Sequence, residues 1–167
     1  MNGITVREAR PNELDAAGSL VADAYLAQGG VDALDPGYLD LIRDARARSA
    51  ACPILVAVEE GSGTVLGSVS YVSGEGNPFA EVERDGEAGF RMLGVAPRAQ
   101  GRGVGEALVR ACIERARADA RSGIAISTTL DSFAAHRLYE RLGFRRDPDR
   151  DFDPVPGIHL IAYVLGL

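Results

Sequence analysis

The stretch that decides the fold is VAPRAQGRGVG, residues 95–105. It follows a predicted strand, residues 87–95, which Pro97 ends because proline cannot donate a hydrogen bond to a sheet. Beyond it, apolar residues recur at helical spacing to about residue 121, so the stretch leads into a long helix. Its glycines let backbone amides approach a ligand closely, and amides at a helix start attract anions. The stretch is therefore a candidate phosphate site, and a tightly packed turn that holds no ligand is the alternative.

Two other kinds of phosphate loop do not fit this stretch. Counted from Gly101, the third glycine of the dinucleotide fingerprint GxGxxG would fall on Glu106. Counted from Gly103, it would fall on Leu108. A Walker loop needs Gly-Lys-Ser or Gly-Lys-Thr, and neither triplet occurs in the chain. Neither kind of nucleotide site is predicted.

The rest of the sequence alternates between strand-like and helical patterns. The glycines of residues 60–63 suit a tight reversal between two strands. Asn12 is a good helix cap, and Gly123 and Gly143 suit helix ends. The predicted strands are residues 4–10, 54–59, 64–73, 87–95, 124–130, 144–146 and 158–165, and the predicted helices are residues 13–26, 36–49, 104–121 and 132–142.

This order of elements predicts an α+β fold with a mixed sheet. The sheet is mostly antiparallel, with one parallel strand pair where a helix joins residues 87–95 to residues 124–130, and about four helices flank it. A length of 167 residues is typical of one domain, which we expect over residues 4–167.

Composition and charge exclude several classes of protein. The formal net charge of -6 leaves no general positive field for nucleic acid, so no nucleic-acid partner is expected. No apolar run has the length of a membrane helix, and the N-terminus does not have the pattern of a signal peptide. Cys52 and Cys112 show no metal-ligand spacing, so no metal site is predicted. We expect a cytoplasmic protein without a membrane partner.

Two motifs give the chain a resemblance to a known family. Residues 100–105, QGRGVG, resemble the Q/R-x-x-G-x-G/A pyrophosphate signature of the GNAT superfamily of N-acetyltransferases. Residues 132–144, SFAAHRLYERLGF, resemble the N-x-x-A-x-x-L-Y-E-x-L-G-F helix of the same superfamily. The order of predicted elements is also similar, so the resemblance covers nearly the whole chain. It implies the GNAT, or acyl-CoA N-acyltransferase, fold.

The resemblance also implies a reaction and a cofactor site. GNAT enzymes pass an acetyl group from acetyl-CoA directly to a primary amine, without an acyl-enzyme. Tyr139 matches the tyrosine that protonates the departing thiolate. Ser132 stands at the family's asparagine and is expected either to contact the cofactor arm or only to cap its helix. The residues implied to bind acetyl-CoA are Leu93, Gly94, Val95, Gln100, Gly101, Arg102, Gly103, Val104, Gly105, Ser132 and Tyr139.

The group that removes the proton from the amine is open. Many family members carry a glutamate at the position of Gly89. Glu87 is the first candidate in its place, because side chains two apart on a strand share a face. The weaker candidates are Glu81, Glu83 and Asp85 in the preceding loop. A solvated charge at the start of the strand is the alternative for Glu87.

The acceptor is also open. We expect a primary amine of a small molecule or peptide, bound near residues 25–41 and 147–158. Four aspartates, Asp147, Asp149, Asp151 and Asp153, would favour a cationic amine, although a solvated loop explains them equally. A homodimer is one assembly left open. The competing function is a non-catalytic acyl-CoA sensor or assembly module with a GNAT-like fold, which Gly89 favours.

Overall fold

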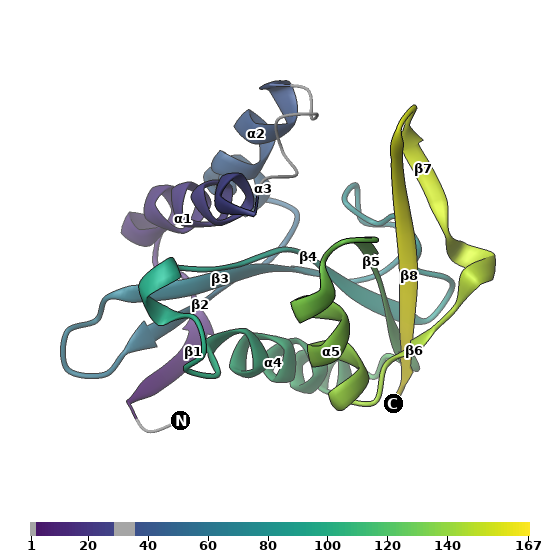
Figure 1. Cartoon of the computed structure of the whole chain (residues 1–167). Helices are drawn as coiled ribbons and strands as arrows, with labels where there is room; N and C mark the ends of the chain where they lie inside the picture. Colours follow the sequence, from purple (N-terminus) through teal and green to yellow (C-terminus); the bar gives the residue numbers. More distant parts are fainter. Residues whose placement is uncertain (1–2, 29–35) are drawn as a thin grey trace. The chain divides into compact units, whose positions relative to one another are not determined.

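Eight strands form the sheet in the computed structural model, which describes residues 3–28 and 36–167 (Figure 1). Their bounds are β1 (Ile4–Glu8), β2 (Ile54–Glu59), β3 (Val65–Val72), β4 (Glu87–Val95), β5 (Gly123–Thr129), β6 (Arg145–Arg146), β7 (Phe152–Val155) and β8 (Ile158–Gly166). The hydrogen-bonded order is β1-β2-β3-β4-β5-β8-β6, and β7 pairs with β8.

The predicted mixed sheet is confirmed. β4 and β5 are parallel, whereas β1 with β2, β2 with β3, and β8 with each of β5, β6 and β7 are antiparallel. The described residues form the α-helices α1 (Leu14–Ala27), α2 (Pro36–Arg43), α3 (Ala45–Arg48), α4 (Val104–Ala118) and α5 (Phe133–Arg141).

The chain divides into two compact units. Unit 1 comprises Met1–Tyr71 and Met92–Ala111, and unit 2 comprises Val72–Arg91 and Cys112–Leu167. Both β4 and α4 therefore begin in one unit and end in the other. The expectation of one domain over residues 4–167 stays a prediction.

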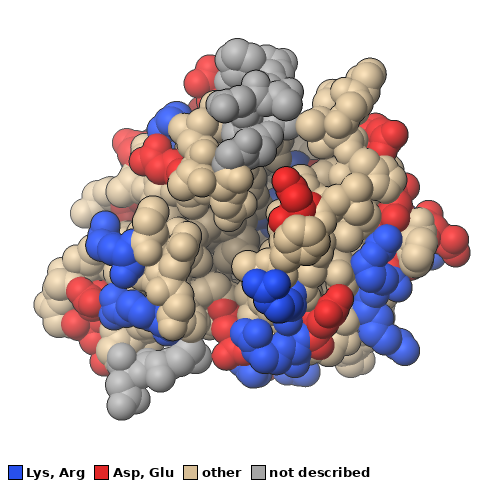
Figure 2. Space-filling model, in the orientation of Figure 1, with Lys and Arg blue, Asp and Glu red and all other residues tan. Residues whose placement is uncertain are grey.

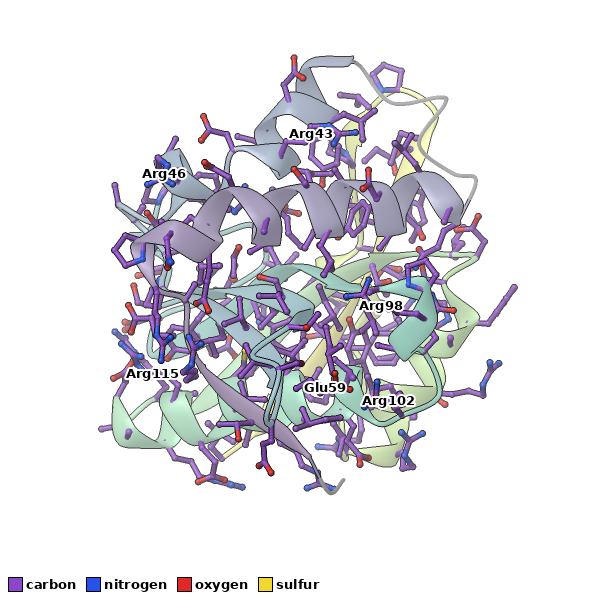
Figure 3. The ribbon with its side chains drawn as sticks, turned by 90° about the vertical axis from the view of Figure 1, so that its left-hand side faces the viewer. Arg43, Arg46, Glu59, Arg98, Arg102 and Arg115 are labelled. Atoms are coloured by element: carbon purple, nitrogen blue, oxygen red, sulfur yellow. The ribbon has the colours of Figure 1, made fainter. Side chains whose placement is uncertain are left out.

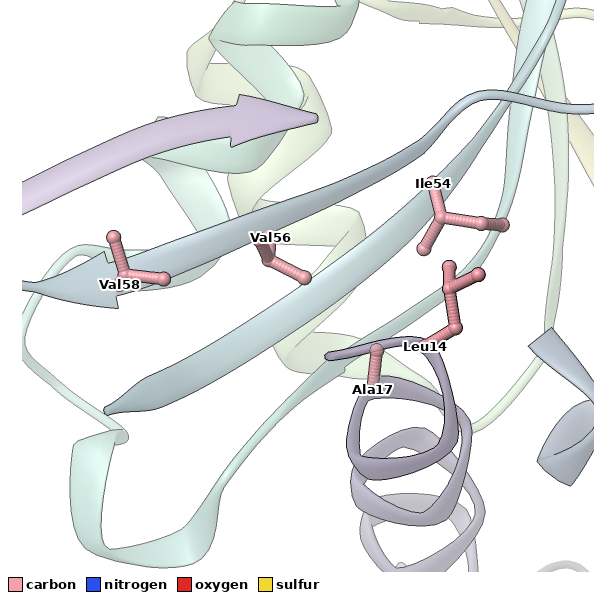
Figure 4. Packing of buried hydrophobic residues seen from close by; sticks show 5 residues of the cluster. All are labelled: Leu14, Ala17, Ile54, Val56 and Val58. Carbon is pink, nitrogen blue, oxygen red and sulfur yellow. The ribbon is translucent and has the colours of Figure 1, made fainter. Parts of the chain in front are cut away.

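The core of unit 1 forms where α1 packs against β2. Ile54, Val56 and Val58 alternate along β2, so their side chains share one face of the strand. Leu14 and Ala17 of α1 cover them (Figure 4). Each large aliphatic side chain buried in this way stabilises the fold by about 1.5–3 kcal/mol.

Two strand glycines let helices approach the sheet of unit 1 closely. A Cβ added at Gly94 would lie 2.9 Å from the Cα of Val21 in α1. A Cβ added at Gly67 would lie 2.8 Å from Cγ1 of Val104 and 3.0 Å from Cδ1 of Leu108, both in α4. Within this unit α1 and the start of α4 lie on opposite sides of the strands (Figure 1).

The first helices depart from the sequence prediction in two places. Asn12 is not a helix cap, because it lies inside a 3₁₀ turn, Pro11–Glu13, which precedes α1. The predicted helix over residues 36–49 is two helices. Asp44 separates them, since its side chain accepts a hydrogen bond from the amide of Ala47 at 2.9 Å and so caps α3. Leu41 is exposed, while Ile42 is fully buried.

Both α4 and α5 end at a residue with a left-handed φ, which is Ala120 after α4 and Gly143 after α5. α4 ends at Ala118, where Ala120 adopts a left-handed φ of 56°. The amide of Arg121 then bonds the carbonyl of Ala116 at 2.9 Å, which closes the helix three residues before its predicted end at residue 121. α5 ends as predicted, with Gly143 at φ 97°.

The late loop also contains a strand that the sequence did not predict. Residues 147–157 carry enough Asp and Pro to indicate a loop, yet β7 pairs with β8 through Phe152 with Leu160 and Val155 with Ile158. Phe152 packs on the buried cluster of Val82, Ala125 and Ala162 in unit 2. That apolar contact favours the strand over the local turn propensity.

Candidate active site

The glycine loop has the backbone that a phosphate site needs. β4 is followed by a 3₁₀ turn, Pro97–Ala99, and α4 begins at Val104. Gly101 and Gly103 have φ of 76° and 80°, a region that residues with a side chain rarely adopt. The first amides of α4 have no partner inside the helix and face the loop side. Gln100, Gly101, Arg102 and Gly103 therefore precede an anion-attracting helix start, as predicted.

Arg102 is held by a carboxylate of the neighbouring hairpin. Its Nη2 lies 3.0 Å from Oε1 of Glu59, and both side chains are partly exposed. This hydrogen bond, with help from Ser62 and the charge of Arg98, holds the pKa of Glu59 below its ordinary value. Figure 3 shows Arg98 and Arg102 on the same side of unit 1 as Glu59. An anion at the loop would meet an arginine that is already positioned.

The end of β4 is irregular just before the residues implied to bind the cofactor arm. Met92 has a φ of 56°, although it carries a side chain that packs on Val21 and Ile42. Such a residue interrupts the pleat of the strand. Side chains before and after Met92 therefore do not follow one alternation between the two faces of the sheet. Leu93 and Val95 are half-buried after it, and Gly94 is buried.

Tyr139 lies in the aromatic core of unit 2. Its ring is buried, with ring centroids 5.8 Å from Phe90, 5.7 Å from Phe144 and 5.9 Å from Tyr163. Burial raises the pKa of Tyr139 well above its ordinary value. The hydroxyl therefore carries its proton at neutral pH, which a proton donor requires.

Ser132 stands at the start of α5 without capping it. Its hydroxyl lies 2.6 Å from Oγ1 of Thr129, and no side-chain cap bond forms. Of its two expected roles, the cap is therefore not found. His136 of the same helix is half-buried, with Nε2 2.8 Å from the carbonyl of Thr129 and its ring 5.7 Å from that of Tyr163.

Glu87 is engaged by an arginine. Arg150 contacts it through two hydrogen bonds, Nη1 to Oε2 at 2.5 Å and Nη2 to Oε1 at 3.0 Å. The amide of Arg84 donates to Oε2 at 2.8 Å. Burial alone would raise the pKa of Glu87, but these bonds outweigh it and lower the pKa. A catalytic role for Glu87 stays a prediction, and its contacts suit a structural role.

Glu83 has the opposite surroundings. Its Oε2 accepts the amides of Glu81 at 2.7 Å and Val82 at 3.0 Å. A Cβ added at Gly89 would overlap its Oε1, so the carboxylate occupies the place of a side chain on that strand residue. Burial raises the pKa of Glu83 more than the backbone hydrogen bonds lower it. The sequence marked Glu83 only as a weaker candidate, because a loop pattern does not show where its side chain lies.

Two of the four aspartates of the late loop form ion pairs with arginines. Arg150 contacts Asp147 at 2.8 Å, and Arg146 contacts Asp151 at 2.8 Å. Asp153 lies 2.6 Å from Nδ1 of His159. Both red and blue side chains lie on the side of the surface where Figure 1 shows β6, β7 and β8 (Figure 2). The loop gives little support to a preference for cationic amines.

Metal and thiol chemistry find no support in the described residues. Among residues 3–28 and 36–167, no group of His, Cys, Asp and Glu could hold a metal ion. In the same ranges no helix is both long and apolar enough to cross a membrane. Cys52 and Cys112 are buried and unbridged, and burial raises the pKa of the Cys112 thiol.

Comparisons with known proteins extend the resemblance. Residues 19–144 match the model of the Acetyltransferase (GNAT) family. N-acetylaspartate synthetase of Danio rerio is 37% identical over 76 residues, which are 46% of this chain and 27% of that protein. This chain thus matches only about a quarter to a third of the length of its curated relatives.

Solved structures match over nearly the full length. A GCN5-related N-acetyltransferase of Kribbella flavida is 27% identical, with a TM-score of 0.73 over 99% of this chain and 98% of that one. yncA of Salmonella typhimurium, whose structure contains its cofactor acetyl-CoA, has a TM-score of 0.70 and 23% identity over 99% of this chain and 95% of that one. The predicted fold and family are confirmed, and the chain belongs to the acetyltransferase (GNAT) family.

Proposed function

We propose that the protein transfers an acetyl group from acetyl-CoA to a primary amine of a small molecule or peptide. The observation that carries this proposal is the glycine loop, in which Gly101 and Gly103 take left-handed φ values directly before α4. A loop of this geometry exposes amides to a diphosphate. The acetyl-CoA found in yncA supports the choice of ligand.

The binding residues divide by the part of acetyl-CoA that they would hold. Amides of residues 101 and 103–105 hold the pyrophosphate, because those of Gln100 and Arg102 already donate to the carbonyls of Pro97 and Ala99. The Arg102 side chain adds a charge beside it. Backbone groups of Leu93, Gly94 and Val95 hold the arm and stabilise the charge that develops on the thioester oxygen. Ser132 contributes a hydroxyl, which its bond to Thr129 orients.

The chemistry is a direct attack. The amine nitrogen forms a bond to the thioester carbonyl carbon, a proton leaves the nitrogen, and the carbon–sulfur bond breaks. Tyr139 gives its proton to the departing sulfur and recovers one from water. An acyl-enzyme has little support, because Cys52 and Cys112 are both buried and the thiolate of Cys112 is disfavoured.

An α-amino acid is the acceptor class to test first. The relatives from Danio rerio and Xenopus tropicalis are named N-acetylaspartate synthetase, and they are 37% and 35% identical over the matched stretches. Pairing of Asp147 and Asp151 with arginines also removes uncompensated negative charge that would repel a carboxylate. L-aspartate is therefore the leading probe in a panel with spermidine and an alanine-terminated peptide.

The test follows release of CoA thiol from acetyl-CoA with each amine of this panel. Acetylated product with one CoA released per acetyl group is the expected result. Binding of acetyl-CoA without release across the panel would favour the sensor function instead. The chain contains no lysine, so acetylation of its own lysine side chains cannot obscure the product.

A matched pair of glycine variants checks the loop. Gly101 and Gly157 both have positive φ and open space where a Cβ would stand. Valine at either position costs similar backbone strain, but only Gly101→Val obstructs the loop. We expect Gly101→Val to lose about tenfold or more in CoA affinity, or ~1.4 kcal/mol. Equal losses in both variants, measured by calorimetry, would remove the loop from the site.

A further inference from the structure

Gly89 leaves a place on β4 that a carboxylate from another segment fills. Gly89, at which the resemblance to the family leads us to expect a glutamate, has no side chain. Oε1 of Glu83 lies where the Cβ of residue 89 would stand. The carboxylate is therefore present at this strand position, although it is supplied from the preceding loop.

Backbone contacts hold Glu83 in this place. Its Oε2 accepts amides from Glu81 and Val82, which leaves Oε1 as the oxygen against Gly89. Val82 is buried in a cluster with Ala125 and Ala162, so the loop is fixed on the strands at the adjacent residue. A carboxylate held in this way loses little entropy when it acts on a substrate.

The strand geometry beside Gly89 is open to such an insertion. Parallel pairing of β4 with β5 comprises Glu87 with Gly123 and Ala88 with Ile124, although both strands run on. Gly89 is the next residue, where a Cβ would lie 2.7 Å from the carbonyl oxygen of Ala125. Glycine at this position thus leaves room for the carboxylate of Glu83.

The charges around Glu83 leave its carboxylate unpaired. Glu81 is the charged group that acts on it from the loop, and Arg91 of β4 and Ser127 of β5 already engage Glu81. From the side of β8, the apolar Ala162 packs on Val82. Within the described part of the chain, no arginine forms an ion pair with Glu83.

We propose that Glu83 is the general base of acetyl transfer, with its carboxylate at Gly89 in the place of a strand glutamate. The inference rests on the proposed function. Glu83 takes one proton from the ammonium form of the acceptor and passes it to water, which leaves a neutral amine. The nitrogen–carbon bond then forms as the carbon–sulfur bond breaks. The sulfur receives the proton of Tyr139, and the second proton that the nitrogen loses returns to Tyr139 through water. One proton is therefore released to solvent in each turnover of the protonated amine.

The experiment compares pH–rate profiles of the wild type and Glu83→Gln with the fastest amine among L-aspartate, spermidine and an alanine-terminated peptide. Glutamine keeps an oxygen for the amides of Glu81 and Val82 but cannot take the proton. We expect kcat/KM near neutral pH to fall by about 10²- to 10⁴-fold. The deficit should shrink as the pH approaches the pKa of the amine, about 10.4 for an alkylamine, where the neutral form no longer needs a base. CoA affinity should not change.

Glu75→Gln is the matched control. Glu75 is an exposed residue of the same loop, and its substitution removes the same charge without touching Gly89. Glu83→Asp, with a shorter side chain, should recover part of the rate if a carboxylate is what matters. An active wild type with equal activity in Glu83→Gln across the pH range would overturn this inference alone. A wild type that acetylates none of the three amines would overturn the proposed function together with it.

Discussion

Glu83 and Glu87 lie four residues apart, yet their surroundings differ in every respect that decides a role. Arg150 donates hydrogen bonds to both carboxylate oxygens of Glu87, and the pKa of that carboxyl is lowered. Glu83 accepts only backbone amides, and burial raises its pKa. A proton acceptor must be available to the substrate and not bound by a cation. The groups that bind each carboxylate, and not its position in the sequence, therefore distinguish a structural glutamate from a candidate base.

Beside the rate loss expected for Glu83→Gln, the largest effect concerns the proton donor, whose loss should have a different pH dependence. Tyr139→Phe keeps the ring among Phe90, Phe144 and Tyr163 and removes only the hydroxyl. We expect single-turnover acetyl transfer to slow by about 10²-fold, the low end for general acid catalysis, because a thiolate leaves with partial help. Unlike the defect of Glu83→Gln, this one should persist at high pH. Wild-type turnover in Tyr139→Phe would leave the residue with a packing role.

The next largest effect is on the stability of the fold, which Glu87→Gln should lower and Glu83→Gln should not. Glu87→Gln breaks a charge-assisted pair that is mostly buried, with side-chain exposures of 9% for Arg150 and 18% for Glu87. We expect a loss of about 1–3 kcal/mol, which lowers Tm by about 2–4 °C per kcal/mol for a chain of this size. Glu83→Gln should not lower Tm at pH 7. Calorimetric melting of both variants checks this, and an equal loss would contradict the contrast.

A smaller effect is expected in the free energy of unfolding, where substitutions at Glu83 and Gly89 should be coupled. Gly89→Ala places a Cβ on Oε1 of Glu83 and 2.7 Å from the carbonyl of Ala125, so overpacking should cost about 1–3 kcal/mol. In a Glu83→Ala background the first clash is absent. We therefore expect a coupling of about 0.5–2 kcal/mol in a double-mutant cycle by urea unfolding. Additive losses would mean that the carboxylate does not occupy this place.

The pH dependence of stability should have opposite signs at the two sites. The pKa of Glu87 is lowered on folding, so its contribution is present above the ordinary value of 4.5 and is lost as the pH falls through the folded pKa. The pKa of Glu83 is raised, so its charge costs stability as the pH rises above 4.5. Between pH 4 and 7, the Tm of Glu87→Gln relative to wild type should fall, and that of Glu83→Gln should rise. Parallel curves would contradict this.

The sequence predicted the elements that local rules determine. The loop of residues 95–105 and the helix that ends at Gly143 depend on glycines whose φ values are a local matter. The end of β4 at Val95 follows from Pro97, which cannot donate a hydrogen bond to a sheet. These features also carry the family resemblance, so the fold and the glycine loop before α4 could both be predicted from the sequence, whereas acetyl-CoA binding at that loop stays a prediction.

Tertiary contacts decide the features that the sequence missed. β7 forms because Phe152 reaches a buried cluster that includes Ala125, more than twenty residues away. The helix of residues 36–49 breaks at Asp44, whose side chain competes with the backbone. The choice between Glu83 and Glu87 depends on Arg150, which lies far along the chain and has no pattern that links it to either residue.

Titration of the two side-chain carboxyls by NMR tests the central claim most directly. The protein is labelled with ¹³C at glutamate, and Glu83→Gln and Glu87→Gln assign the two resonances. The account predicts that Glu83 titrates above the ordinary value of 4.5 and Glu87 below it. A Glu83 carboxyl that titrates at or below the pKa of Glu87 would show a carboxylate already stabilised by a partner, and it would contradict the assignment of Glu83 as the base.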